Sequence, residues 1–277
     1  MAQAANTPIE GSFEPARAVW LGNADRIRNA IRQEMIFRQL CRHLPATPAT
    51  VLDVGAGQGT QSIRLARAGY RVLAVEPDAR MREVFGRALL AEPAEVRERI
   101  SVRTGAVGQL AQHCAGQRFD GVLLLGVLMY LPSWRPVLAE LAAHVADGGI
   151  LAVAARTTVS ALWRPAARQD WLAAAAALAE FDVAATSGRD MPYRNEIGAP
   201  AQAQDRAALV AAAEAAGLQL EDWYGVRVAA DLAELDPAPP QDQAEWDALL
   251  LVEERLGSMD PFRQLAQLAH LIWRRPA

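Results

Sequence analysis

Short apolar runs that end at a glycine or an acidic residue recur along the chain. Val51–Val54 leads into a glycine-rich stretch, and Val72–Val75 ends at Glu76. Runs of this length, flanked by turn residues, are typical of buried parallel strands. The same signal predicts further strands at Ile100–Thr104, Phe119–Leu125, Ile150–Ala155, Leu218–Val228 and Ala269–Trp273.

Helical periodicity fills most of the stretches between these runs. In Ala24–Leu44 apolar residues recur every three to four positions, and Asp25 lies in the first turn, where a carboxylate stabilises a helix. Ala184–Pro200 has no such pattern and is predicted to be a loop. Other helices are predicted at Thr60–Ala68, from Met81 to about Leu90, and at Leu138–Val145, Trp163–Phe181, Arg206–Ala216 and Trp246–Leu256. Alternating strands and helices indicate an α/β fold.

The first two strands enclose a loop with the sequence Gly-Ala-Gly-Gln-Gly. Its glycines allow a tight turn and let a ligand approach the backbone. Asp53, near the end of the first strand, is costly to bury unless another group pairs with it. Strand, glycine loop, helix, strand and the acid Glu76 together predict a nucleotide-binding half-fold.

The spacing of the glycines argues against a dinucleotide. A G-x-G-x-x-G fingerprint that starts at Gly55 would need glycine at position 60, where this chain has Thr60. The pattern D-x-G-x-G-x-G, followed by an acid after the second strand, instead resembles class I S-adenosylmethionine (SAM) methyltransferases. The resemblance implies that Asp53 is the acid before the loop and that Glu76 accepts hydrogen bonds from the two ribose hydroxyls.

The resemblance also implies a Rossmann-like seven-stranded sheet, with six parallel strands, the last one antiparallel and helices on both faces. An N-terminal helix and a helical insertion complete this fold. Residues 1–23 are expected to form a flexible arm, and residues 24–277 a single SAM-dependent methyltransferase domain. Within it, residues 45–156 would bind the cofactor, and residues 157–277 would supply the substrate-side insertion and closing strands.

Cofactor-binding residues follow from the family's motifs. Arg28 matches the family residue that reaches the cofactor's carboxylate; with Arg32 one turn away, the alternative is a solvated arginine face. The family often has an acid after the third strand, where the nearest polar side chain here is Gln109. The residues that the resemblance places against SAM, or against its product S-adenosylhomocysteine, are Arg28, Asp53, Gly55, Ala56, Gly57, Gly59, Glu76, Pro77, Ala106, Val107 and Leu125.

Composition excludes several kinds of chemistry. The chain has 277 residues, 52% of them hydrophobic and 22% charged, which is typical of a globular protein. All 28 basic residues are arginine, so a P-loop lysine, a Schiff-base lysine and a lysine general base are excluded. The net charge of −4 argues against a strongly basic nucleic-acid surface.

The cysteines and histidines are scattered. Two cysteines and four histidines lie without metal-ligand spacing, so no metal site is predicted. No apolar run approaches the ~18 residues of a membrane span, and Met1–Gly11 lacks the regions of a signal peptide. We therefore expect a cytoplasmic protein that does not bind membranes. The sequence leaves its oligomeric state open.

Short motifs outside the cofactor loop resemble those of the tRNA carboxymethoxyuridine methyltransferases and their relatives. These motifs are Arg28–Ile31, Tyr224–Val228, Ala248–Arg255 and Asp260–Phe262. The family's lysine-rich segment is replaced here by Ser187–Arg194, and its polar residues after the fourth strand by Leu125 and Met129. Fewer cationic side chains mean fewer phosphate contacts. A small acceptor is therefore favoured, and tRNA stays an alternative.

The chemistry would be an in-line transfer of a methyl group from a sulfonium to oxygen or nitrogen. A carboxylate acceptor is favoured because it is already ionised and needs positioning rather than a general base. Arg194 and Arg227 are candidates for orienting an anionic acceptor, and Tyr130 for lining its pocket; the catalytic residues are not identified. A SAM-binding sensor or partner subunit without transferase activity is the alternative from another class.

Overall fold

The computed structural model describes residues 16–114, 116–232 and 235–277. Within these ranges a seven-stranded sheet has the order β3-β2-β1-β4-β5-β9-β8. Its strands are β1 (Thr50–Val54), β2 (Arg71–Val75), β3 (Ile100–Arg103), β4 (Phe119–Leu125), β5 (Val145–Ala155), β8 (Gln219–Val226) and β9 (Leu268–Arg274). Only β9 runs antiparallel to its neighbours β5 and β8. The expected Rossmann-like sheet, with six strands in one direction and the last reversed, is confirmed.

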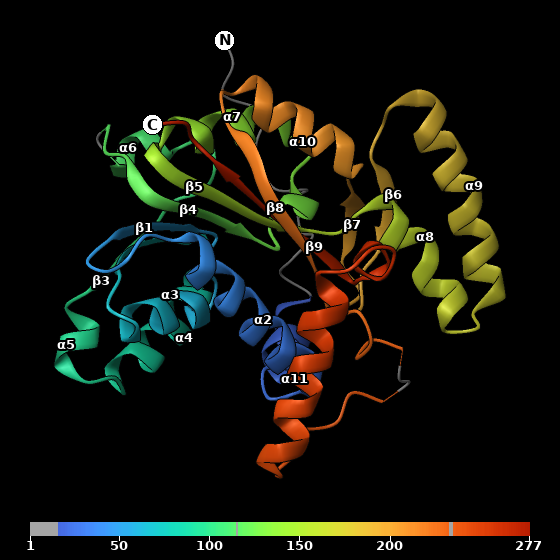
Figure 1. The fold of residues 1–277 in the computed structure, drawn as a ribbon, viewed down its shortest axis with the longest axis horizontal. Coiled ribbons are helices and arrows are strands. Elements are labelled where there is room, and N and C mark those ends of the chain that lie inside the picture. The colour runs from blue at the N-terminus through green and yellow to red at the C-terminus, as the bar shows by residue number, and fades with distance from the viewer. Residues whose placement is uncertain (1–15, 115, 233–234) are drawn as a thin grey trace.

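Helices cover both faces of this sheet (Figure 1). One face packs against α2 (Ile27–His43), α3 (Thr60–Arg67), α4 (Ala79–Leu90) and α11 (Gln243–Gly257). The other face packs against α6 (Leu110–Cys114), α7 (Arg135–Ala143) and α10 (Arg206–Ala215). The remaining helices are α1 (Arg17–Gly22), α5 (Ala94–Arg97), α8 (Thr158–Ala167), α9 (Trp171–Ser187) and the 3₁₀ turns η1 (Leu128–Tyr130) and η2 (Phe262–Leu265).

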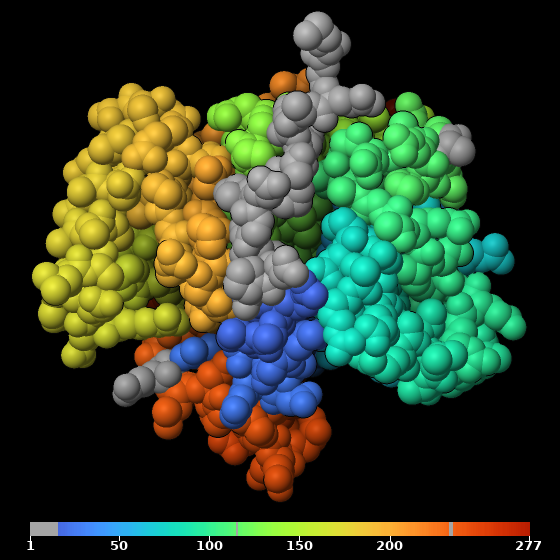
Figure 2. All heavy atoms as spheres, turned by 180° about the vertical axis from the view of Figure 1, so that it is seen from behind, coloured from blue at the N-terminus to red at the C-terminus, as the bar shows by residue number. Residues whose placement is uncertain are grey.

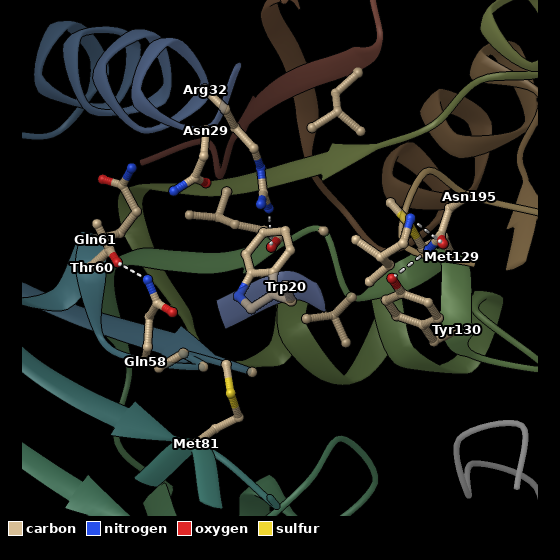
Figure 3. Close-up of a pocket in the computed structure, with 18 of the residues that line it drawn as sticks. Trp20, Asn29, Arg32, Gln58, Thr60, Gln61, Met81, Met129, Tyr130 and Asn195 are labelled. Atoms are coloured by element: carbon tan, nitrogen blue, oxygen red, sulfur yellow. Dashed lines mark hydrogen bonds between the residues drawn. The ribbon is translucent and has the colours of Figure 1, made fainter. Parts of the chain in front are cut away.

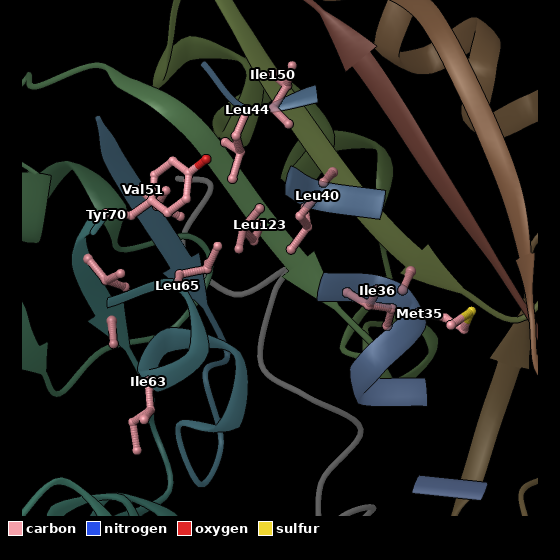
Figure 4. Close-up of a cluster of buried hydrophobic side chains, with 14 of the residues drawn as sticks. Met35, Ile36, Leu40, Leu44, Val51, Ile63, Leu65, Tyr70, Leu123 and Ile150 are labelled. Carbon is pink, nitrogen blue, oxygen red and sulfur yellow. The ribbon is translucent and has the colours of Figure 1, made fainter. Parts of the chain in front are cut away.

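The apolar strand residues divide between two cores. In β4, Leu123 packs with the core that contains α2, whereas Val122 and Leu124 pack with the core that contains α7. Consecutive residues of a strand point to opposite faces, and both faces of this sheet are covered. This explains why the strands are continuous apolar runs rather than alternating ones. Figure 4 shows the first core, in which Leu40 of α2 and Leu123 lie close together.

The structure differs from the sequence prediction in the second half of the chain. The single helix predicted at Trp163–Phe181 is two helices, α8 and α9, and Gln169 between them has φ +60°. The predicted loop Ala184–Pro200 contains the end of α9 and most of a hairpin, β6 (Met191–Arg194) and β7 (Pro200–Ala203). The two strands of this hairpin pair with each other and not with the large sheet. They are therefore not covered on both faces and have no continuous apolar run that would identify them in the sequence.

The N-terminal region also differs. Of the expected flexible arm 1–23, residues 1–15 lie outside the described residues, and Arg17–Gly22 form helix α1. Seen from behind, the blue N-terminal segment lies between the α8–α9 side of the molecule, in yellow, and the cyan side that holds α3 and α4 (Figure 2). Helix α1 is therefore placed to contribute to the region where these two sides meet.

Gly59 sets the start of α3 and brings it close to α4. Its φ of +82° is in the left-handed region, and a Cβ there would lie 2.2 Å from Cδ2 of Phe85. Phe85 is fully buried, so its ring has little room to move aside. Glycine at this position therefore satisfies both a backbone and a packing requirement.

We predict that Gly59→Ala lowers the free energy of unfolding by about 2–4 kcal/mol, from left-handed strain plus overpacking. Gly148→Ala is the matched control, because Gly148 has φ +73° with open space around its Cβ. It should cost only about 1–2 kcal/mol. Urea unfolding of both variants measures the difference, and equal losses would show that Phe85 accommodates the methyl group.

Candidate active site

A cavity of about 540 Å³ lies at the carboxyl ends of β1, β2, β4 and β5. The sheet order reverses between β1 and β4, and ligands of open α/β sheets bind at such a switch point. Loops after these strands line it, together with α1, α2 and the segment that joins β6 to β7. Figure 3 shows side chains from α1, α2 and the post-strand loops directed into this space.

The glycine loop is held against the second strand. The N–H groups of Gly55 and Ala56 both donate to the carbonyl of Val75, at 2.7 and 3.2 Å. Gly55 has φ +70°, and a Cβ there would lie 2.4 Å from Cγ2 of Val127. Gly57 has φ +59°, and its Cβ would lie 3.3 Å from Cε of Met81, which also lines the cavity. The loop therefore presents bare backbone to the cavity.

Glu76 also holds the glycine loop in place. Its two carboxylate oxygens accept hydrogen bonds from the N–H groups of Gly57, at 2.7 Å, and Asp78, at 2.8 Å. Burial raises the pKa of the Glu76 carboxyl, although these two donors oppose the shift. A carboxylate oxygen has two lone pairs, so each oxygen retains one for a ligand. Glu76 lines the cavity and can accept from two hydroxyl groups.

Asp53 lies at the end of β1, below the loop. It is 3% exposed, and Oδ2 accepts a hydrogen bond from the hydroxyl of Ser62 in α3, at 2.6 Å. Burial raises the pKa of Asp53 to about 6, with the Ser62 hydrogen bond opposing it. The partner that the sequence required for this carboxylate is therefore a hydroxyl and not a cation.

The apolar part of the expected cofactor site is also present in the cavity. Four of its residues, Pro77, Ala106, Val107 and Leu125, line the cavity near the carboxyl ends of β2, β3 and β4. Gln109 is exposed and is not among the lining residues. That Pro77, Ala106, Val107 and Leu125 contact SAM stays a prediction.

Two arginines of α2 enter the cavity. Nε of Arg28 lies 3.5 Å from Oδ1 of Asp231, and the Arg28 backbone N–H donates to Asp236 at 3.1 Å. Arg32 is buried, donates from Nη2 to the carbonyl of Leu125 at 3.1 Å, and lies 4.9 Å above the ring of Trp20 (Figure 3). Burial lowers the pKa of Arg32 to about 10. The alternative of a solvated arginine face is therefore wrong for Arg32.

Tyr130 and Tyr193 also line the cavity. Nδ2 of Asn195 donates to the hydroxyl of Tyr130 at 2.8 Å, and the hydroxyl of Tyr193 donates to the sulfur of Met129 at 3.2 Å. Burial raises the pKa of Tyr130 to about 12 and also raises that of Tyr193. Both hydroxyls are therefore neutral near pH 7. The guanidinium of Arg156 lies 4.7 Å above the ring of Tyr193.

Arg227, expected to orient an acceptor, lines the cavity but is already paired. Its Nε donates to Oδ1 of Asp231 and its Nη2 to Oε2 of Glu196, both at 2.7 Å. Burial alone would lower the pKa of Arg227, but the two carboxylates hold it above its ordinary value. In turn, and against the effect of burial, Arg227 holds the pKa of Glu196 at about 2. The two ion pairs largely neutralise the charge of Arg227, which leaves little of it for a ligand.

Two expected site residues do not line the cavity. Arg194 is exposed and donates from Nη1 to the carbonyl of Gly198 at 2.5 Å. Alternate residues of β6 point to opposite sides, so Tyr193 faces the cavity and Arg194 faces solvent. Gly59 caps α3 instead of touching the cavity. The other expected cofactor residues, and Tyr130 and Arg227, all line it.

The structure also brings in residues that sequence reasoning missed. Trp20 comes from the expected arm, Arg32 was left on a solvated face, and Arg156 and Glu196 carried no expectation. Arg156 had a usable signal, since it directly follows the apolar run Ile150–Ala155 and ligands bind at the carboxyl ends of such strands. No local sequence pattern around Trp20 or Glu196 indicates that either residue lines the cavity.

Comparison with known proteins agrees with this site. A family model described as a methyltransferase domain matches residues 28–222. The chain is 28% identical over 151 residues to the ubiquinone biosynthesis O-methyltransferase of Methylobacterium nodulans, and 32% identical over 141 residues to the magnesium-protoporphyrin O-methyltransferase of Rhodobacter capsulatus. These matches span 50% and 49% of this chain, and 58% of each relative.

A solved structure adds evidence for the fold. The glycopeptide N-methyltransferase MtfA, in complex with S-adenosylhomocysteine, superposes with a TM-score of 0.54 over 88% of this chain and 90% of its own, at 14% identity. At this identity the likeness shows the fold alone.

The fold and the glycine-lined cavity with its acid define a class I SAM-dependent methyltransferase. The chain belongs to the methyltransferase-domain family whose model it matches over most of its length. Its cofactor is SAM, and the cavity fits this cofactor, because a Cβ at Gly57 would enter the cradle and Glu76 retains lone pairs for two hydroxyls. In the part of the chain that the structure describes, no helix is long and apolar enough to cross a membrane.

We predict that Glu76→Ala weakens SAM binding by about 2 kcal/mol, or roughly 30-fold, because two ribose hydroxyls lose a charged acceptor. Glu83→Ala, which removes an exposed carboxylate of α4, is the control and should bind SAM like wild type. Titration calorimetry measures both. Wild-type affinity in the Glu76 variant would mean that the ribose lies elsewhere.

The raised pKa of Asp53 predicts a pH-dependent stability. Between the ordinary value of 3.8 and about 6 the folded protein binds a proton that the unfolded chain does not, so this group makes the protein more stable as pH falls through 6. Without SAM, Asp53→Asn should exceed wild type in stability by on the order of 2 kcal/mol at pH 7.5. The gap should close toward pH 4. A gap that stays constant across urea titrations from pH 4.5 to 8 would contradict the assignment.

Proposed function

We propose that this enzyme transfers the methyl group of SAM to an ionised oxygen, most favourably a carboxylate, of a small anionic acceptor. The observation that carries the proposal is the composition of the cavity beyond the glycine loop. Its wall contains arginines and neutral tyrosine hydroxyls, and the carboxylates that also line it are all hydrogen-bonded or ion-paired within the protein.

Five carboxylates from the described residues line the cavity, and each has a partner. Asp78 accepts from the N–H of Met81 and lies 3.2 Å from Nε of Arg17. Asp236 accepts from the backbone N–H of Arg28.

Glu196, with a pKa of about 2 and an ion pair to Arg227, is a weak proton acceptor. Asp53 accepts a hydrogen bond from Ser62, and Glu76 accepts from the N–H groups of Gly57 and Asp78, so both carboxylates are engaged in holding the glycine loop and its neighbours. None of the four histidines is among the lining residues that the described chain supplies. An alcohol or phenol would therefore receive little help in losing its proton.

A carboxylate needs no such help. When bound, SAM supplies a sulfonium methyl group, and its transfer to a carboxylate oxygen leaves a neutral thioether and a neutral ester with no proton to remove. The chain's own residues then contribute by holding the acceptor in line, which can supply much of the acceleration of such a reaction. We assign the cofactor's ribose to Glu76, and its carboxylate to the arginines of α2.

The relatives favour oxygen over nitrogen. Both curated relatives are named O-methyltransferases, although this chain spans little more than half of their length. A nitrogen of a small acceptor stays the alternative atom. The short motifs that resemble tRNA methyltransferases keep tRNA as an outcome for experiment to decide.

Labelled SAM tests the proposal directly. The enzyme is incubated with a pool of small carboxylic acids, a pool of small amines, and bulk tRNA that lacks the wobble ester. We expect label in the carboxylic acids as base-labile esters, with a shallow dependence on salt because few phosphates are involved. Transfer to tRNA that falls steeply between low and moderate salt would overturn the small-acceptor proposal.

A further inference from the structure

A network of arginines around two carboxylates, Asp231 and Glu196, adjoins the cavity through Arg28, Arg227 and Glu196. Asp231 is fully buried, and four arginines reach it, at 2.5 to 4.0 Å: Arg28, Arg164, Arg168 and Arg227. The second carboxylate, Glu196, is taken by Arg227 and by Nε2 of Gln267 at 2.7 Å. Both carboxylates are therefore occupied.

Arg156 makes no hydrogen bond or ion pair with this network, although Glu196 and Asp231 are near enough for their charges to oppose the lowering of its pKa by burial. It directly follows β5, is 7% exposed and lines the cavity. Its Nε is buried without a hydrogen-bond partner, and within the described ranges no carboxylate lies in ion-pair distance of its guanidinium. Its backbone is fixed, because the Arg156 carbonyl accepts from the N–H of Gln204 at 3.0 Å.

The contact with Tyr193 does not satisfy this side chain. A ring 4.7 Å below the guanidinium interacts with its flat face. The five N–H donors point outward in the plane of the group and need acceptors of their own. A buried cation without a paired anion is costly, so a nine-tenths buried arginine of this kind points to a ligand. The stacking of Arg156 on the Tyr193 ring fixes the direction in which the N–H donors point.

We propose that Arg156, oriented by the ring of Tyr193, is the anion-binding residue of the acceptor site and takes a single carboxylate of a small acceptor. This rests on the proposed function and names the residue that carries it out. An arginine that holds one carboxylate oxygen leaves the other free to attack the methyl group. Methylation removes the negative charge, so the same residue favours binding of the acid and release of the ester.

Acid-against-ester binding tests this role without turnover. The enzyme is saturated with S-adenosylhomocysteine and titrated with benzoate and hexanoate, and separately with methyl benzoate and methyl hexanoate. Wild type should bind at least one of the acids about 10-fold or more tightly than its ester, as expected for a charged hydrogen-bonded contact. Calorimetry or thermal shift gives the affinities.

Three variants assign the effect to Arg156. Arg156→Gln should weaken acid binding ~10- to ~100-fold and leave ester binding nearly unchanged. Arg156→Lys should restore part of the acid preference, because it keeps the charge and loses the fork. Arg194→Gln, on the solvent side of the same hairpin, is the matched control and should behave like wild type. All three should bind SAM with wild-type affinity, which also reports that they are folded.

The assignment of Arg156 would be overturned if wild type and Arg156→Gln bound the acids equally. It would also be overturned if the wild-type enzyme bound neither acid, or bound neither acid more tightly than its methyl ester. If labelled SAM still methylates carboxylic acids in either case, the proposed function stands and only the role of Arg156 fails. If no carboxylic acid is methylated while Arg156 still selects acids, the site binds an anionic group and the methylated atom is a different one.

Discussion

The cofactor half of this protein depends on the attachment of one loop to one strand. β1 and β2 pair in register up to Val54 and Val75, so the loop after β1 starts beside the end of β2. Backbone hydrogen bonds from the start of the loop to Val75, and from Gly57 to the carboxylate of Glu76, then hold the loop down. The same carboxylate that fixes the loop is left with lone pairs facing the cavity. Structure and cofactor recognition therefore share one residue.

The acceptor half depends on a different constraint: a buried arginine needs an anionic partner. This chain has no lysine, and beside the cavity several guanidinium groups gather around two carboxylates, Asp231 and Glu196. Arg227 is fully paired, because it donates to the carboxylates of both Asp231 and Glu196. Arg156 is the opposite case: it stacks on the ring of Tyr193, its backbone is fixed, and its buried Nε has no hydrogen-bond partner. A bound anion would complete the network that the protein alone leaves incomplete.

The fold and most of the proposed cofactor site could be predicted from the sequence, because their signals are local. Apolar runs that end in glycine or acid mark β1 and β2, and the spacing of the glycines selects the class of cofactor. The break between α8 and α9 was missed, although Asp170 caps the start of α9 by accepting from the N–H of Ala173, and aspartate is a preferred residue at that position. The β6–β7 hairpin was also missed, because its short strands carry no apolar pattern.

The roles of the individual arginines were the hardest feature of the site to predict from the sequence. Arg194 and Tyr193 are neighbours in sequence, and only the pleat of β6 decides which of them meets the cavity. Arg227 was recognised as a site residue, but the partners that neutralise it come from Glu196, on the loop between β6 and β7, and Asp231. Arg156 stands at the end of β5, where a parallel strand most often delivers a functional side chain, and that rule would have singled it out.

The most direct test of the account is a crystal structure of the enzyme with S-adenosylhomocysteine and a carboxylic acid that it binds. The account predicts that both ribose hydroxyls lie within hydrogen-bond distance of the Glu76 carboxylate. It also predicts that the acid's carboxylate meets the guanidinium of Arg156 on the face of Tyr193. A ribose placed away from Glu76, or a carboxylate bound elsewhere with Arg156 still unpaired, would contradict it.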